Sequence, residues 1–129
     1  MKSNNYSLLL VSSVLMVLID SLYLSSVSKY FNKQIKMVQG SPIKLDLLSA
    51  IVCYLFLIFG LYYFVLQKKG SVLDAFFLGL VIYMVYENTN KAILKKWSWN
   101  TVLLDGFWGG ILFALTTYLT YAICNKFKL

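Results

Sequence analysis

Four apolar runs, each about 20 residues long, constrain the fold of this chain more than any other feature. They cover approximately residues 6–27, 47–66, 72–90 and 101–124. A helix of about 20 apolar residues crosses the hydrocarbon core of a bilayer, which is roughly 30 Å thick. The sequence therefore predicts an all-α integral membrane protein, in which a single domain is formed by a bundle of four transmembrane helices.

The composition also indicates a membrane environment. Hydrophobic residues make up 60% of the 129 residues and charged residues only 13%, which leaves too little polar surface for a soluble domain. All 12 basic residues are lysines, and they lie between the apolar runs rather than in one patch. Such lysines are typical of side chains that contact lipid headgroups. We therefore expect the lipid bilayer, and no nucleic acid, as a partner.

Residue types that commonly perform catalysis or bind metals are scarce. The sequence has no histidine, and neither of its two cysteines lies in a metal-ligand spacing. We therefore expect no metal, no cofactor and no enzymatic activity. A lipid-modifying enzyme with an Asp20/Asp105 acid–base pair, or with a magnesium ion between the carboxylates, ranks last among the alternatives.

Four consecutive spans place both termini on the same side of the membrane. The lysines are divided too evenly between the two sides to fix the orientation. The connection over residues 28–46 is polar and basic, and it contains the only proline, Pro42. Its residues 29–39 fit a short interfacial helix and an ordinary loop about equally.

Three carboxylates interrupt the apolar runs at a similar depth. Asp20 lies toward the end of the first run, Glu87 at the end of the third, and Asp105 about one turn into the fourth. Because consecutive spans alternate in direction, all three should lie toward the same membrane face. Charged groups inside a bilayer are costly and usually face a protein interior or a watery cavity. We therefore predict a polar cluster that is a candidate site for binding a ligand or ion.

Polar and aromatic neighbours extend this candidate site. Trp108 lies three residues after Asp105 and Asn90 three residues after Glu87, so each pair shares a helical face. Nearby tyrosines can donate hydrogen bonds to the carboxylates. The predicted binding residues are the three acids and these neighbours: Asp20, Tyr23, Tyr86, Glu87, Asn90, Asp105 and Trp108.

A row of small residues marks one face of the fourth run. Gly106, Gly110 and Ala114 follow a small-x-x-x-small pattern, which lets another backbone approach closely. We predict that this row packs against a helix, and it is the face through which a homodimer would form. A larger membrane complex is the other candidate assembly.

Three motifs resemble those of one membrane family. Residues 20–24 (Asp-Ser-Leu-Tyr-Leu) are similar to its Asp-x-x-Trp-Leu, and residues 86–90 (Tyr-Glu-Asn-Thr-Asn) to its Tyr-Asp-x-Thr-Asn. Asp105, Trp108 and Gly109 match its Asp-x-x-Trp-Gly. On these residues the chain resembles, over nearly its whole length, the four-helix membrane family known as domain of unknown function 2177. The resemblance implies a four-span bundle in which the motifs meet, and it implies no activity.

Two classes of function fit these features. The first is a small transporter or channel-like protein whose carboxylates bind protons, a cation or a small solute. The alternative is a structural or assembly subunit of a membrane complex, in which the polar cluster only fixes the register of the helices. Loss of flux in a folded Asp105→Asn variant would favour the first class.

Overall fold

The computed structural model describes residues 4–129, and within that range it contains helices and no strand. The last turn of the second long helix widens into a π-helix, labelled η1. All four spans are long and apolar enough to cross a membrane, so the predicted all-α membrane bundle is confirmed. The elements are α1 (Asn5–Gln39), α2 (Leu47–Leu61), η1 (Tyr62–Leu66), α3 (Val72–Ile93) and α4 (Trp99–Lys126).

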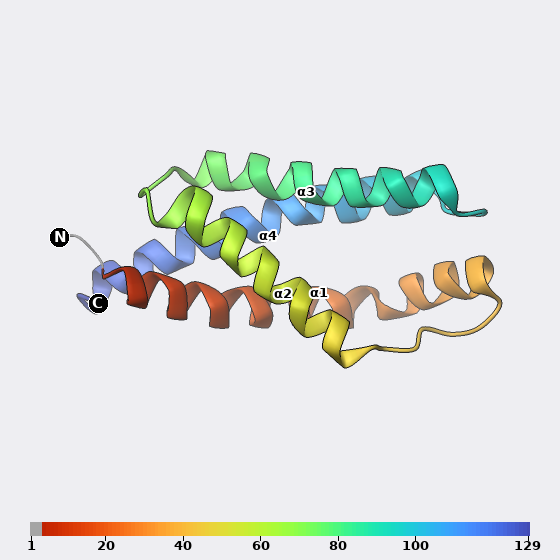
Figure 1. Cartoon of the computed structure of the whole chain (residues 1–129), viewed down its shortest axis with the longest axis horizontal. Coiled ribbons are helices and arrows are strands. Elements are labelled where there is room, and N and C mark those ends of the chain that lie inside the picture. Colours follow the sequence, from red (N-terminus) through yellow and green to blue (C-terminus); the bar gives the residue numbers. More distant parts are fainter. Residues whose placement is uncertain (1–3) are drawn as a thin grey trace.

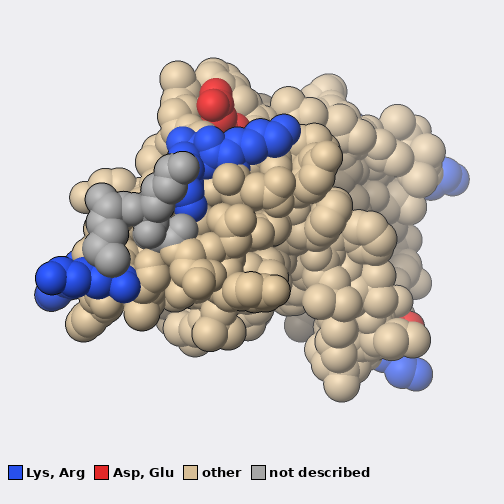
Figure 2. Space-filling view, turned by 60° about the vertical axis from the view of Figure 1, so that its left-hand side comes forward, with Lys and Arg blue, Asp and Glu red and all other residues tan. Residues whose placement is uncertain are grey.

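The helices are arranged around the pair formed by α3 and α4, which lie side by side (Figure 1). α1 packs on α4, and α2 crosses the bundle obliquely. The two ends of the described chain meet, since the backbone N–H of Asn4 donates to the carbonyl oxygen of Leu129 at 3.1 Å. Most of the face in Figure 2 is formed by uncharged residues, and the lysines stand out in small separate groups.

α1 is longer than the first apolar run indicates. It continues without a break through residues 28–39. The prediction of a separate interfacial helix or a loop over residues 29–39 is therefore wrong. The reason is local: no glycine or proline lies between residues 5 and 39. The helix ends only at Gly40, which takes the left-handed conformation (φ 79°) and donates its N–H to the carbonyl of Lys36. The 35 residues of α1 extend over roughly 52 Å, beyond the thickness of a hydrocarbon core.

Side-chain caps fix where the other helices begin. Asp46, Ser71 and Ser98 each accept a hydrogen bond from a backbone N–H three residues later, at the N-termini of α2, α3 and α4. These caps set the helical register. The caps at Ser71 and Ser98 begin the two helices that carry Glu87 and Asp105.

Two glycines let the backbones of α3 and α4 touch. A methyl group added at Gly79 would lie 2.1 Å from the carbonyl oxygen of Gly109, and no backbone atom can be that close to a Cβ. Gly109 in turn leaves room for the ring of Tyr83. This close approach brings the end of α3 and the start of α4 together, where Glu87 and Asp105 are located.

The small-residue row of α4 faces α3 of the same chain. A side chain at Gly106 would meet Met84, and one at Gly110 would meet Phe76. Ala114, the third member of the row, is partly buried. The row does pack against a helix, but the face that we considered for a homodimer is covered within the chain. A homodimer would have to use another surface.

Candidate ligand-binding site

Asp20 connects three helices through its carboxylate. The hydroxyl of Tyr54, on α2, donates to Oδ2 at 2.5 Å, and the indole Nε1 of Trp108, on α4, donates to Oδ1 at 2.9 Å. The side chain of Asp20 is 6% exposed. Because each of its oxygens accepts a hydrogen bond from a different helix, Asp20 holds α1, α2 and α4 in register.

Glu87 and Asp105 form a pair of carboxyl groups that are hydrogen-bonded to each other. The indole Nε1 of Trp97 donates to Oε1 of Glu87 at 2.8 Å, and the hydroxyl of Tyr23 donates to Oδ1 of Asp105 at 3.2 Å. Glu87 is 1% exposed and Asp105 9%. A bare carboxylate only accepts hydrogen bonds, so a bond between two carboxyl groups contains a shared proton.

An aromatic stack joins the pair to Asp20. The rings of Tyr23 and Trp108 are parallel within 4°, with their centroids 4.3 Å apart. Tyr23 donates to Asp105, and Trp108 donates to Asp20. The three carboxyl groups therefore belong to one connected cluster, to which all four helices contribute.

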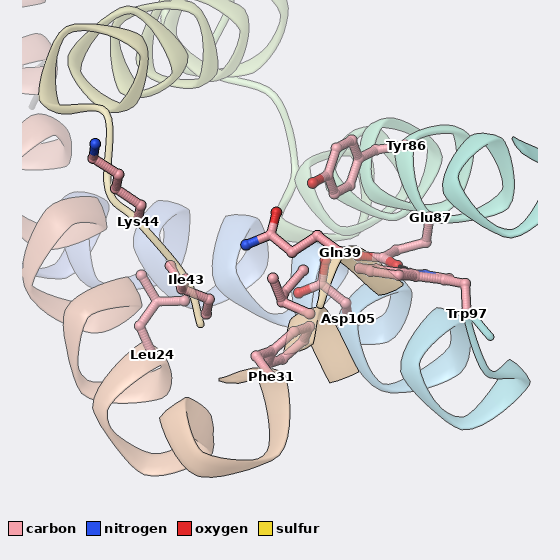
Figure 3. A pocket seen from close by; sticks show the side chains of 10 residues that line it. Leu24, Phe31, Gln39, Ile43, Lys44, Tyr86, Glu87, Trp97 and Asp105 are labelled. Carbon is pink, nitrogen blue, oxygen red and sulfur yellow. Dashed lines mark hydrogen bonds between the residues drawn. The ribbon is translucent and has the colours of Figure 1, made fainter. Parts of the chain in front are cut away.

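A cavity of about 450 Å³ lies beside the pair. Figure 3 shows Asp105, Glu87 and Trp97 together at one side of the cavity, and Lys44 at the other with its amino group directed away from Asp105. The carboxyl pair is thus the polar end of a cavity with largely apolar walls. Its remaining lining residues are Leu24, Phe31, Ile35, Gln39, Ile43 and Tyr86.

The structure brings together five of the seven predicted binding residues: Asp20, Tyr23, Glu87, Asp105 and Trp108. Tyr86 lies at the edge of the cavity and is 58% exposed. The side chain of Asn90 makes no hydrogen bond within residues 4–129, and its backbone carbonyl accepts the N–H of Leu94 where α3 ends. These two residues therefore lie outside the hydrogen-bonded cluster.

Tyr54 and Trp97 belong to the cluster but were not predicted. Tyr54 lies in a span without charged residues, so nothing in its own helix points to a carboxylate. Trp97 is in a lysine-rich connection and resembles an ordinary interfacial tryptophan. A buried acid needs donors, and the phenol and indole groups at the same depth in neighbouring spans were the available signal.

A second buried polar group holds the connection that carries Trp97. Gln34, on the extended part of α1, donates from Nε2 to the carbonyl of Lys96 at 2.6 Å. Its Oε1 accepts the backbone N–H of Ser98 at 3.2 Å and the hydroxyl of Thr101 at 2.8 Å. Because Lys96 and Ser98 flank Trp97 in the chain, the unexpected extension of α1 fixes the position of that indole.

The chemistry available at the cluster is that of carboxyl, phenol and indole groups. Carboxyl groups bind protons or cations, whereas the phenols and indoles here donate hydrogen bonds. Within the described part of the chain, no group of three or more His, Cys, Asp or Glu residues could hold a metal ion. The carboxyl groups of the cluster are the groups that can bind a proton or a cationic group.

Four apolar helices around a buried carboxyl cluster define an integral membrane protein. Residues 5–122 match the model of the family described as "Predicted membrane protein (DUF2177)". The chain belongs to this family, and the matched region includes every residue of the cluster. No curated protein and no solved structure matches the chain.

Proposed function

We propose that this membrane protein binds protons and a small cationic solute at the Glu87–Asp105 pair, and that this binding serves transport rather than catalysis. The observation that carries the proposal is the hydrogen bond between two buried carboxyl groups at the wall of a cavity. Intramembrane carboxyl groups are expensive and commonly mark proton and ion pathways.

Charge balance explains why a proton and a cation would compete there. Two bare carboxylates about 4 Å apart repel each other by roughly 4 kcal/mol even at an effective dielectric constant of about 20. The shared proton removes one of these charges. A cationic group in the cavity can do the same, so its arrival favours release of the proton.

The donors around the pair support a preorganised site. Trp97 and Tyr23 each donate to one carboxyl group, and Gln34 holds the chain on both sides of Trp97. Groups fixed in this way need no rearrangement to receive a ligand. We further propose that both termini lie on the same side of the membrane, because Asn4 and Leu129 meet at one end of the bundle.

The test is a flux assay with the purified protein in lipid vesicles that contain a pH-sensitive dye. The proposal expects proton movement coupled to a gradient of an organic amine, with at least tenfold less flux in Asp105→Asn. Asp74→Asn is the matched control, since Asp74 is an exposed residue in the first turn of α3. Equal flux in Asp105→Asn and wild type, or no flux above protein-free vesicles, would contradict the proposal.

A structural role is the second candidate, and Asp20 is the observation that favours it. Both of its oxygens are used by interhelical hydrogen bonds, which are worth about 0.6 to 1.7 kcal/mol each in membrane proteins. A subunit that only assembles a complex would need such bonds without any flux. Co-purification of a partner with a flux-inactive but folded wild-type protein would support this candidate.

A further inference from the structure

Asp105 also lines a second cavity, of about 310 Å³. Cys53 and Leu57 of α2 line it together with Ile82 and Tyr83 of α3. Apart from the carboxyl group of Asp105, these walls are mostly apolar. The second cavity is therefore an apolar space between two helices that ends at a buried carboxyl group.

The two cavities converge on the same residues. Asp105 and Tyr86 line both of them. Asp105 also holds the hydrogen bond to Glu87, so the carboxyl pair is located at the junction. A ligand bound through its charged group at Asp105 could place apolar parts in either space.

Part of the second cavity lies at the depth of the hydrocarbon core. Leu57 and Ile82 lie near the middle of their spans, and the middle of a span corresponds to the hydrocarbon core. Their neighbours Phe56 and Val81 are 71% and 58% exposed on the outer surface of the bundle. A compound that enters between α2 and α3 would therefore come from the apolar part of the bilayer.

We propose that the ligand of this site is a lipid-soluble organic cation, with one positive charge on an apolar body, and that it reaches Asp105 through the cavity between α2 and α3. This inference rests on the proposed function and specifies its ligand class and route. The apolar walls fit the body of the ligand, and cavities of this size commonly hold small organic molecules.

The charges around the site favour a single positive group. The carboxyl pair shares one proton, so one cationic group can take its place. Lys44 borders the first cavity, and its positive charge makes that cavity a less favourable route for a cation. A lipid-soluble cation avoids that route because it is already concentrated in the bilayer.

The probe for the experiment is tetraphenylphosphonium, measured by equilibrium binding to the purified protein in phosphatidylcholine nanodiscs, with empty nanodiscs as the partitioning control. Wild type is expected to bind it saturably, and not to bind the similarly sized anion tetraphenylborate. Ile82→Trp fills the second cavity and should weaken binding at least tenfold. Val81→Trp places the same ring on the adjacent lipid-exposed position and should leave binding within twofold of wild type.

A second blocking variant keeps the test decisive if Ile82→Trp does not fold. Cys53→Phe narrows the same cavity from α2, at an exposed position, and should also weaken binding at least tenfold. Absence of saturable binding would overturn the ligand class, and unchanged binding in both blocking variants would overturn the route. If these results occur while amine-coupled proton flux still depends on Asp105, only this inference fails. If that flux is absent as well, the proposed function fails with it.

Discussion

The indole Nε1 of Trp108 lies 2.9 Å from Oδ1 of Asp20, a residue 88 positions earlier in the chain. The same indole stacks on the ring of Tyr23. Trp108 thus has two roles that can be separated, because one depends on its N–H group and the other on its ring. A phenylalanine at this position keeps an aromatic ring and removes the donor.

Trp108→Phe should lower the free energy of unfolding by roughly 1 to 3 kcal/mol, since one oxygen of a buried carboxylate loses its partner. Unfolding in a denaturing detergent, followed by circular dichroism, measures this change. Trp99→Phe is the control, because Trp99 is 61% exposed. Similar destabilisation in both variants would show that the hydrogen bond to Asp20 contributes little.

Gln34→Leu should also destabilise the protein, by roughly 1 to 3 kcal/mol. Leucine has similar volume but leaves the carbonyl of Lys96 and the N–H of Ser98 without their partner. Trp97 should then move away from Glu87, which would change the fluorescence of the tryptophans. Gln67→Leu, at an exposed position, should alter neither stability nor fluorescence. Unchanged emission in Gln34→Leu would mean that Gln34 does not position Trp97.

Gly79→Ala should prevent correct packing of α3 on α4, because its methyl group would overlap the backbone carbonyl of Gly109. Overpacking typically costs about 1 to 3 kcal/mol, and a contact with backbone is at the upper end of that range. Gly60→Ala is the matched comparison, since a methyl group there meets nothing within 4 Å. That variant should be as stable as wild type or up to about 1 kcal/mol more stable. Equal unfolding curves for the two variants would contradict the close approach of the helices.

The sequence predicted the four spans well because membrane helices are specified by long apolar runs, which are local features. The convergence of Asp20, Glu87 and Asp105 was also predictable, since alternating spans bring those positions to one depth. The continuation of α1 to Gln39 was not predictable, because the polar composition of residues 28–39 resembles that of a loop. Helix propensity and the absence of glycine and proline before Gly40 favoured the helix instead.

Side-chain partners and helix neighbours were the less predictable part. Trp97 reaches Glu87 only because Gln34 holds the connection in place. The partners of Gln34 are Lys96 and Ser98, which lie 62 and 64 positions later in the chain. A row such as Gly106 and Gly110 indicates close packing without identifying the partner helix. Here the partner is α3 of the same chain, which depends on the fit of Met84 and Phe76.

In the proposed function, the Glu87–Asp105 pair is retained for binding, whereas Asp20 stabilises the fold. Thermal unfolding of Asp20→Asn, Glu87→Gln and Asp105→Asn in the same detergent separates these roles. An asparagine at position 20 cannot accept from both Tyr54 and Trp108 through two oxygens, so its melting temperature should fall. An amide in either member of the pair can donate to the remaining carboxylate and accept from Tyr23 or Trp97.

Glu87→Gln and Asp105→Asn should therefore melt at or above the wild-type temperature, as expected for groups kept for function at some expense in stability. Asp20→Asn should melt clearly below it. A fall in melting temperature for Glu87→Gln and Asp105→Asn as large as that for Asp20→Asn would contradict this division of roles. It would show that all three carboxyl groups stabilise the fold.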